Sequence, residues 1–233
     1  MREICLDLET TGLEPRDGHR IIEIGCVELV GKVRTGSFYH AFVNPERDMP
    51  EEAFKIHGIS GEFLKDKPKF SQVVKEFLTY IEGAKLVIHN AGFDMKFINH
   101  ELRKCDLEII ERMHVIDSLE IARNKFPGAG NSLDALCKRF NVDTSRRIKH
   151  GALLDAELLA EVYLELSGGG QTSIFEVTAI DAKLNNKVKI VETSEKSFLE
   201  PRDFSLSLED LEAHQKFITE NFKQNFWGYN KAS

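Results

Sequence analysis

Two carboxylates in the first apolar segment restrict what this chain can fold into. Residues 3–9 alternate as a β-strand does, so Asp7 and Glu9 project from the same face of an extended chain. Three aliphatic side chains project from the opposite face: Ile4, Leu6 and Leu8. A buried charge costs several kcal/mol unless a partner neutralises it. The face that carries Asp7 and Glu9 therefore needs such a partner.

Two later segments repeat this pattern on helices. Asp155 lies in the segment 151–166, on a stripe shared at helical spacing with four aliphatic residues: Leu158, Leu159, Val162 and Leu166. Asp94 precedes Phe97 and Ile98 by three and four residues on another expected helix. No Arg or Lys occupies an obvious pairing position in these segments. We therefore expect four carboxylates to face the body of the protein and converge.

Converging carboxylates repel one another unless a cation lies among them. Oxygen ligands without cysteine favour Mg²⁺ or Mn²⁺, and two such ions about 3.5–4 Å apart can clamp a phosphoryl group during in-line displacement. Asp7 and Glu9, on one face, could contact two adjacent ions. His150 stands just before the helix of Asp155, and from a loop its imidazole could accept a proton from water at the metal site.

Each of these residues also has an ordinary structural explanation. A lone acidic pair in a strand is weak evidence of catalysis, and a lone aspartate on a helix more often caps it or forms a salt bridge. Asp94 is close to a helix start, where the dipole stabilises a negative charge. His150 by itself is explained as a histidine on a surface loop. The joint pattern is what favours a metal-dependent phosphoryl-transfer site.

Composition limits the class of protein. The 233 residues are 42% hydrophobic and 30% charged, as in a globular protein. No apolar run reaches the 18 or so residues of a membrane span, and the N-terminus lacks the basic and apolar regions of a secretory signal. Four cysteines without a CxxC pair argue against zinc and favour a reducing, cytoplasmic setting. We expect Cys5 and Cys137 to be small core residues.

The net charge of −7 limits the partners. A protein that coats long duplex DNA is more often basic. Any nucleic acid held here is therefore expected to be short, with its phosphates neutralised by metal ions or by the positive surface of a partner.

The order of the expected elements predicts a mixed α/β fold. Three antiparallel strands come first, at 3–9, 20–30 and 33–43, with a hairpin turn at Gly31 and Lys32. Pro45 and Pro50 mark a loop. Helices and short strands then alternate, with helices at 71–82, 92–104, 131–142 and 151–166 and strands at 85–89 and 113–119. This order favours a mixed sheet with helices on its faces.

The chain changes character after a run of three glycines. Residues 1–175 form the first predicted domain, and residues 176–205, with weak periodicity, are expected to be a linker. Residues 206–233 form a C-terminal segment with a short helix predicted over 208–222, for which Ser207 is the expected N-cap.

Three motifs resemble those of the DEDDh 3′–5′ exonucleases. They are LDLETTG with Asp7 and Glu9, HNAGFD ending in Asp94, and HGALLDA with His150 and Asp155. All five residues occur in the family's order. Within the family, AFKIHGIS, NSLDALCKRF and HGALLDAELLAEVYLELSGGGQTS are most similar to the proofreading subunits of bacterial DNA polymerase III. The resemblance is dense over the first predicted domain and thin beyond it.

The resemblance implies an RNase H-like fold and a role for each motif residue. Asp7, Glu9 and Asp155 would bind one divalent ion, either Mg²⁺ or Mn²⁺. Asp7 would also contact a second ion, which Asp94 would support. His150 would be the general base. The implied reaction is hydrolysis of single-stranded or mispaired DNA 3′ ends to nucleoside monophosphates.

Further residues match the family's pocket for the 3′-terminal nucleotide. The whole implied substrate set is Asp7, Glu9, Thr10, Leu13, Glu52, His57, His89, Phe93 and Asp155. Thr10 and backbone donors can hold a phosphate or the 3′-hydroxyl, while Leu13 and Phe93 can wedge against the terminal base. His57 and His89 could equally be hydrogen-bonded structural residues.

The resemblance also implies partners. The run of Gln171, Thr172, Ser173, Ile174 and Phe175 resembles the short peptides that bind the bacterial sliding clamp. The C-terminal segment resembles the part that docks on the polymerase catalytic (alpha) subunit, although an amphipathic helix on a linker could instead fold back on its own domain. A small accessory subunit is a further expected partner. Two rival functions stay open: a DEDDh ribonuclease that trims RNA 3′ ends, and a non-catalytic scaffold subunit of a replication complex.

Overall fold

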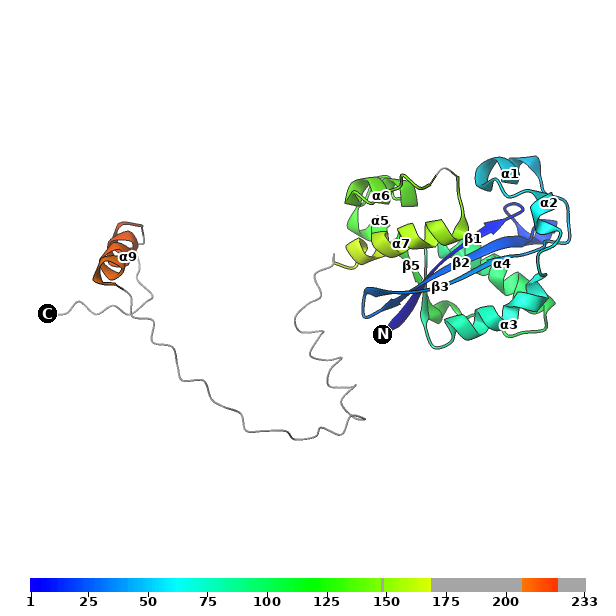
Figure 1. Ribbon diagram of the computed structural model, residues 1–233, viewed down its shortest axis with the longest axis horizontal. Coiled ribbons are helices and arrows are strands. Elements are labelled where there is room, and N and C mark those ends of the chain that lie inside the picture. The colour runs from blue at the N-terminus through cyan, green and yellow to red at the C-terminus, as the bar shows by residue number, and fades with distance from the viewer. Residues whose placement is uncertain (148, 169–206, 222–233) are drawn as a thin grey trace, which may run out of the picture. The chain divides into compact units, whose positions relative to one another are not determined.

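A five-stranded mixed sheet is the centre of this protein (Figure 1). The structure, a computed structural model, describes residues 1–147, 149–168 and 207–221. The strands lie in the order β3-β2-β1-β4-β5, and helices flank them. The prediction of a mixed sheet flanked by helices is therefore confirmed.

The first three strands form the predicted antiparallel meander. They are β1 (Arg2–Thr10), β2 (Ile21–Val30) and β3 (Val33–Phe42). Gly31 and Lys32 join β2 to β3 with φ angles of 59° and 64°, and two left-handed residues are what the commonest two-residue hairpin requires. In the register of β1 with β2, Asp7 lies opposite Gly25 and Glu9 lies opposite Glu23.

The other two strands run parallel to β1. They are β4 (Lys85–Ile88), which pairs with β1, and β5 (Val115–Asp117), which pairs with β4. Since these strands are parallel, their carboxyl ends meet at one edge of the sheet, where ligands bind in open α/β folds. The same edge receives the end of β1 that carries Asp7 and Glu9.

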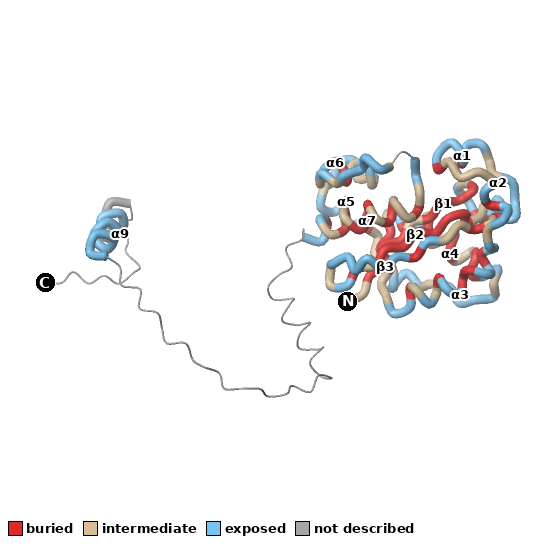
Figure 2. Tube along the Cα trace, in the orientation of Figure 1, coloured by how far each residue is buried: buried red, intermediate tan, exposed pale blue. Residues whose placement is uncertain are grey.

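Helices cover both faces of the sheet, so most strand residues are buried (Figure 2). The helices α3 (Phe70–Ile81) and α4 (Ala91–Lys104) share a core with Ile4, Leu6 and Leu8. On the other face α7 (Ala152–Leu166) packs on β1 and β2 around Cys5. The helices α5 (Ser118–Lys125) and α6 (Leu133–Phe140) pack beside α7, where Cys137 is buried. Both predicted core cysteines are buried.

Several short helices differ from the expected pattern. They are α1 (Glu51–His57), α2 (Gly61–Leu64) and α5, with the 3-10 turns η1 (Pro15–Asp17) and η2 (Arg112–His114). No element was predicted between Pro50 and residue 71, and α1 has no apolar stripe because it buries only Ala53 and His57. The strand expected over 113–119 ends at Asp117, whose side chain accepts a hydrogen bond from Leu119 N–H and starts α5.

The last described element is α9 (Leu208–Asn221). Ser207 Oγ accepts a hydrogen bond from Asp210 N–H at 3.1 Å, as the predicted N-cap requires. The predicted linker 176–205 lies outside the described residues, as does the end of the predicted first domain. Among the residues that the structure describes, no helix is both long and apolar enough to cross a membrane.

Candidate active site

The structure brings the five motif residues together at the edge where the parallel strands end. A cavity of about 220 Å³ lies there. Its lining includes all five: Asp7, Glu9, Asp94, His150 and Asp155. They come from β1, from α4, and from the start of α7 with the loop before it. The expected convergence of carboxylates is therefore present, and the role of each residue remains a prediction.

Asp94 reaches the cavity because α4 begins directly after β4. Its N-cap residue, Asn90, has a left-handed φ of 65°, a conformation that Asn adopts more readily than most residues. The Asp117 carboxylate, from β5, accepts hydrogen bonds from the backbone N–H groups of Asn90 and Ala91, both at 3.1 Å. Asp117 thus holds the first turn of α4, and with it Asp94, against the neighbouring strand.

Asp155 and His150 are positioned by the junction of β2 with α7. Glu23 Oε2 accepts a hydrogen bond from Ala152 N–H at 3.1 Å, and Glu23 Oε1 lies 2.7 Å from His40 Nε2. A negative charge at the first turn of a helix is stabilised by the helix dipole. A Cβ atom at Gly25 would lie 2.2 Å from the Ala152 backbone carbon. The glycine therefore lets α7 approach β2 closely enough to place Asp155 beside Glu9.

Arg147 corrects the expectation that no cationic side chain pairs with the carboxylates. Arg147 Nε lies 2.6 Å from Asp155 Oδ1, and Nη2 donates to Asp155 Oδ2 at 2.8 Å. The same guanidinium also contacts Asp134. Asp155 is buried and Arg147 is half-buried, with side chains 4% and 9% exposed. Sequence patterns gave no sign of this pair because Arg147 lies in a loop without periodicity.

His150 is held over the cavity by its ring nitrogen Nδ1. This atom lies 3.1 Å from Asp155 Oδ2 and 2.8 Å from Arg147 Nη2. A hydrogen bond from Nδ1–H to Asp155 leaves Nε2 free to accept a proton, whereas donation from Arg147 to Nδ1 gives the opposite tautomer. The side chain is 47% exposed, so water and substrate can reach it.

The pKa values of three carboxylates in the cavity are raised, as expected for buried acids that lie close together. Burial raises the pKa of Glu9 to about 8, and the charge of Asp155 adds to the shift. Burial also raises the pKa of Asp94 to about 8, against hydrogen bonds from backbone N–H groups that include that of Leu8. The pKa of Asp7 is raised by burial and by the charges of Asp94 and Asp155. Such shifts are typical of functional sites.

The donor atoms fit a divalent cation. Glu9, His150 and Asp155 each offer a ligand atom within 4.8 Å of the others. Asp155 Oδ1 is buried and makes no hydrogen bond among the described residues, although Arg147 Nε lies close to it. A carboxylate-rich set without cysteine suits a hard cation. This set shares Glu9 and Asp155 with the predicted metal site but includes His150 in place of Asp7, so the ligand assignment remains a prediction.

The predicted substrate residues divide between two regions. His89 and Phe93 line the same cavity as the carboxylates. Thr10 is buried, and its hydroxyl donates to Gly12 carbonyl oxygen at 2.7 Å. Leu13 is 74% exposed on the loop after β1, and Glu52 is exposed at the start of α1.

His57 stands at the end of α1 with one nitrogen unused. Its Nδ1 accepts a hydrogen bond from Ile59 N–H at 2.9 Å, so the neutral ring carries its proton on Nε2. Nε2 is buried and finds no partner within the described structure. The segment before His150 lies close by, since Lys149 Nζ sits 5.3 Å from the Phe54 ring centre. The run 171–175, expected to bind a sliding clamp, lies outside the described residues.

Comparison with known proteins places the chain in a family. Residues 4–163 match the Exonuclease (RNase_T) family. The chain is 52% identical over 224 residues to DNA polymerase III subunit epsilon of Rickettsia prowazekii (strain Madrid E), an alignment that covers 94% of this chain and 96% of that one. It is also 52% identical to the same subunit of Escherichia coli (strain K12) over 180 residues, or 74% of each chain.

The chain belongs to the epsilon-subunit family of exonucleases. The prediction of a proofreading-type 3′–5′ exonuclease is therefore confirmed at the level of the family. Exonucleases of the DEDDh type use divalent metal ions, as the carboxylates of this epsilon-family site would require.

Solved structures agree with this assignment. Exonuclease X in complex with 5′ overhanging duplex DNA superposes with a TM-score of 0.55 at 26% identity, over 73% of this chain and 93% of that one. The nuclease domain of 3′hExo, described as a DEDDh family member bound to rAMP, gives a TM-score of 0.62 at 21% identity, over 72% and 92%. The RNase H-like fold predicted for this epsilon-family chain is thus confirmed.

Three positioning residues of this epsilon-family site were not predicted: Glu23, Asp117 and Arg147. Glu23 could have been found, because it is a carboxylate in the apolar run 21–27, the same signal that marked Asp7. Asp117 ends an apolar strand as a capping residue does. Arg147 gave no such signal.

Proposed function

We propose that this site removes the last nucleotide from a DNA 3′ end by a two-metal mechanism. Asp7, Glu9 and Asp155 would hold one divalent ion, and Asp7 with Asp94 would hold the second, Mg²⁺ and Mn²⁺ being the candidates. The observation that carries the proposal is the meeting of these four carboxylates with His150 in one cavity. When bound, the ions would polarise the scissile phosphate and lower the pKa of the attacking water.

The chain's own groups supply the proton transfer and the positioning. His150 accepts the proton of the attacking water through Nε2 once its Nδ1–H donates to Asp155. The unpartnered Nε2–H of His57 would donate to an oxygen of the terminal nucleotide. Thr10 and Glu52 would line the same end of the substrate, while Leu13 and Phe93 would wedge against the terminal base. A mispaired end enters more easily because it costs less to unstack.

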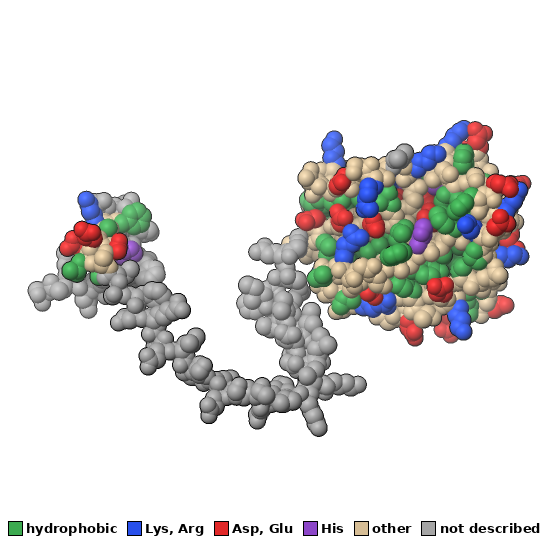
Figure 3. All heavy atoms as spheres, viewed as in Figure 1, with side chains coloured by type: hydrophobic (Ala, Val, Ile, Leu, Met, Phe, Trp, Pro, Cys, Tyr) green, Lys and Arg blue, Asp and Glu red, His purple; other side chains and the backbone are tan. Residues whose placement is uncertain are grey.

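The charge distribution is consistent with a short single-stranded substrate. On the face of the described body seen in Figure 3, Lys and Arg side chains lie among Asp and Glu and form no single basic stripe. The chain as a whole carries a net charge of −7. Binding therefore depends on the metal site and on a few specific contacts rather than on a long electrostatic footprint.

The name of the relatives supports assembly into a DNA polymerase III complex. We propose that residues 206–233 bind the catalytic (alpha) subunit and that Gln171–Phe175 bind the sliding clamp. A small accessory subunit is a further proposed partner. The four cysteines are free thiols, consistent with the proposed cytoplasmic location.

Two substitutions test the mechanism. Asp7→Ala should abolish Mn²⁺-dependent digestion of a 3′-labelled oligonucleotide, and His150→Ala should lower turnover by about 10²–10⁴-fold, the usual range for a general base. Glu161→Gln is the matched control, since it changes a half-buried carboxylate farther along α7 that pairs with Arg34 away from the cavity. Full activity in Asp7→Ala would refute the metal assignment. Digestion of matched DNA and RNA oligomers side by side would separate the proposed activity from RNA trimming.

A further inference from the structure

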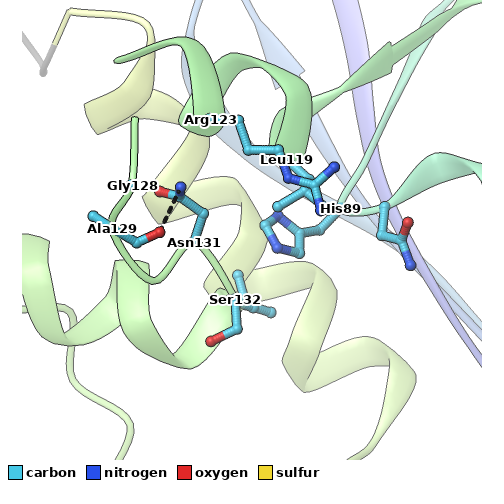
Figure 4. A pocket seen from close by; sticks show the side chains of 9 residues that line it. His89, Leu119, Arg123, Gly128, Ala129, Asn131 and Ser132 are labelled. Atoms are coloured by element: carbon cyan, nitrogen blue, oxygen red, sulfur yellow. Dashed lines mark hydrogen bonds between the residues drawn. The ribbon is translucent and has the colours of Figure 1, made fainter. Parts of the chain in front are cut away.

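A second cavity opens beside the active site, and the function proposed above leaves it unused. It has a volume of about 560 Å³ and lies between the end of β4, α5 and the loop that leads into α6 (Figure 4). It shares His89, Asn90 and Leu133 with the carboxylate cavity. The two cavities are therefore neighbours that one extended ligand could occupy together.

The second cavity contains one arginine side chain, which is unpaired among the residues that the structure describes. Arg123 projects from α5 and, in Figure 4, extends toward His89. It forms no ion pair or hydrogen bond with any residue that the structure describes. Its charge still reaches His89, whose pKa is lowered chiefly by burial and also by Arg123. A guanidinium placed in this way can bind a phosphate through two parallel N–H donors.

The opposite wall is a loop held in one shape by its own hydrogen bonds. Asn131 Nδ2 donates to Ala129 carbonyl oxygen at 3.0 Å and to that of Phe126 at 3.2 Å. Arg139 Nη2 donates to Gly130 carbonyl oxygen at 3.1 Å, and its guanidinium stacks over the Phe126 ring. These hydrogen bonds order the loop without a ligand, so binding costs less conformational entropy.

The cavity also has apolar surface suited to a base. Leu119 and Leu133 contribute aliphatic side chains to its lining. A nucleotide presents an apolar ring face beside an anionic phosphate, so it matches a cavity that combines leucines with one arginine. Asn131 and Ser132, on the loop side in Figure 4, add polar groups around this surface.

We infer that this cavity binds the nucleotide on the 5′ side of the scissile bond, with its phosphate on Arg123. The inference rests on the proposed function and names a subsite for it. Of the residues proposed for the terminal nucleotide, only His89 lines both cavities, whereas Thr10, Leu13, Glu52, His57 and Phe93 do not line this one. The strand therefore has its 3′ end toward those residues and its continuing end toward Arg123.

Arg123→Gln tests the inference with two substrates in Mn²⁺. One is the p-nitrophenyl ester of thymidine 5′-monophosphate, which has no upstream nucleotide, and the other is a single-stranded hexanucleotide. The KM for the hexanucleotide should rise about tenfold, as for loss of one charge-assisted phosphate contact. Hydrolysis of the ester should be unchanged. The binding constant of the hexanucleotide should also depend less on salt. The magnitude of the slope of its logarithm against the logarithm of the salt concentration should fall by about 0.7, the value for one phosphate of a single strand.

Lys125→Gln is the matched control because it removes the same charge from an exposed position on α5 that does not line the cavity. Ala129→Phe, which fills the cavity from an exposed position, should also raise only the KM for the hexanucleotide. Arg123→Lys should recover part of the lost affinity, since it keeps the charge without the bidentate fork.

Two outcomes would overturn the inference. One is that Arg123→Gln matches Lys125→Gln on the hexanucleotide. The other is that Arg123→Gln slows hydrolysis of both substrates equally, because the arginine would then act through His89 on the catalytic centre.

Fluorescence anisotropy of a labelled phosphorothioate hexanucleotide in Ca²⁺ separates the subsite proposal from the proposed exonuclease function. Arg123-dependent binding without hydrolysis of either substrate would refute the proposed function and leave the subsite standing.

Discussion

At the scale of single residues, the site is a cluster of buried acids with one internal cation. Arg147 binds Asp155 through two nitrogens and also contacts His150 Nδ1. In this arrangement it neutralises a carboxylate that the proposed mechanism assigns to a divalent ion. The arginine and a divalent ion would therefore compete for Asp155, although each relieves the repulsion within the cluster.

Substitution of Arg147 tests this competition. Removing one partner of a buried ion pair leaves an uncompensated charge, so Arg147→Gln should lower the free energy of unfolding in EDTA by about 3 kcal/mol. The stabilisation gained on adding Mn²⁺ should become larger than in the unsubstituted protein. Urea unfolding with and without Mn²⁺ measures both effects.

Arg146→Gln is the control, since Arg146 pairs with Glu157 on the surface with its side chain 69% exposed. It should change the unfolding free energy by less than about 0.5 kcal/mol. Equal effects of Arg147→Gln and Arg146→Gln on the unfolding free energy would show that Arg147 does not stabilise the carboxylates of the site.

The raised pKa values predict an unusual pH dependence for the metal-free protein. The pKa of Glu9 rises from 4.5 to about 8 on folding, and that of Asp94 rises from 3.8 to about 8. Between these limits the folded state binds more protons at these two groups than the unfolded state, so their contribution to stability is greatest below pH 4 to 5 and falls as the pH rises toward 8. Urea midpoints measured in EDTA from pH 5 to 8, a range inside that window, should show this fall.

Glu9→Gln serves as the comparison, because it removes one of the titrating groups and should flatten the profile. A urea midpoint that stays constant or rises over the same pH range would contradict the prediction.

At the scale of elements, the contact of β2 with α7 decides where the catalytic helix lies. Gly25 leaves no room for a side chain against the Ala152 backbone, and Glu23 accepts the Ala152 N–H. Register places these two residues opposite Asp7 and Glu9. Helix α7 is therefore seated on β2 at the level where Asp155 must meet the carboxylates of β1.

Gly25→Ala tests the seating of α7. The added Cβ would lie 2.2 Å from the Ala152 backbone carbon, so α7 must shift, at a cost of about 1–3 kcal/mol of stability as in other overpacked cores. Exonuclease turnover should fall together with stability, because Asp155 moves with the helix. Thermal unfolding and a 3′ digestion assay provide the two measurements.

Gly92→Ala is the matched control, since Gly92 is helical and a Cβ there meets nothing within 4 Å. That variant should be neutral or slightly more stable, because alanine favours the helix. A normal turnover in Gly25→Ala would show that the close approach does not position Asp155.

At the scale of the whole molecule, the described core belongs to the first part of the chain. All three buried apolar clusters of the described structure lie between residues 4 and 166. Helix α9 has Leu208 80% exposed and Leu211 38% exposed. The catalytic body therefore contains its own core, and the proposal that residues 206–233 bind the catalytic subunit assigns the exposed leucines of α9 to that contact.

Deleting residues 180–233 tests whether the catalytic body is stable and active without the C-terminal residues. The thermal midpoint of the body and its activity on a 3′-labelled oligonucleotide should stay close to those of the full chain, because no core cluster of the described structure is removed. Binding to the polymerase catalytic subunit, measured by calorimetry, should be lost. Loss of activity instead would mean that the tail belongs to the catalytic body.

Much of the fold was predictable because the spacing of apolar residues and the turn residues in the local sequence specify its strands and helices. Alternation predicted β1 and the meander, and Gly31 with Lys32 occupies the expected hairpin turn. Helical spacing predicted α3, α4, α6 and α7 to within two residues at each end. The short helices α1 and α5 were missed, because they bury few side chains and lack a full apolar stripe.

The sequence by itself determined that carboxylates on separate apolar elements must face inward, because periodicity alone sets the direction of a side chain from a strand or helix. Only the tertiary structure decided what surrounds them. Arg147 reaches Asp155 from an irregular loop, and Arg123 on α5 lines one cavity with His89, which follows β4. Contacts between distant segments depend on how the sheet and helices pack in three dimensions, and no spacing along the chain encodes them.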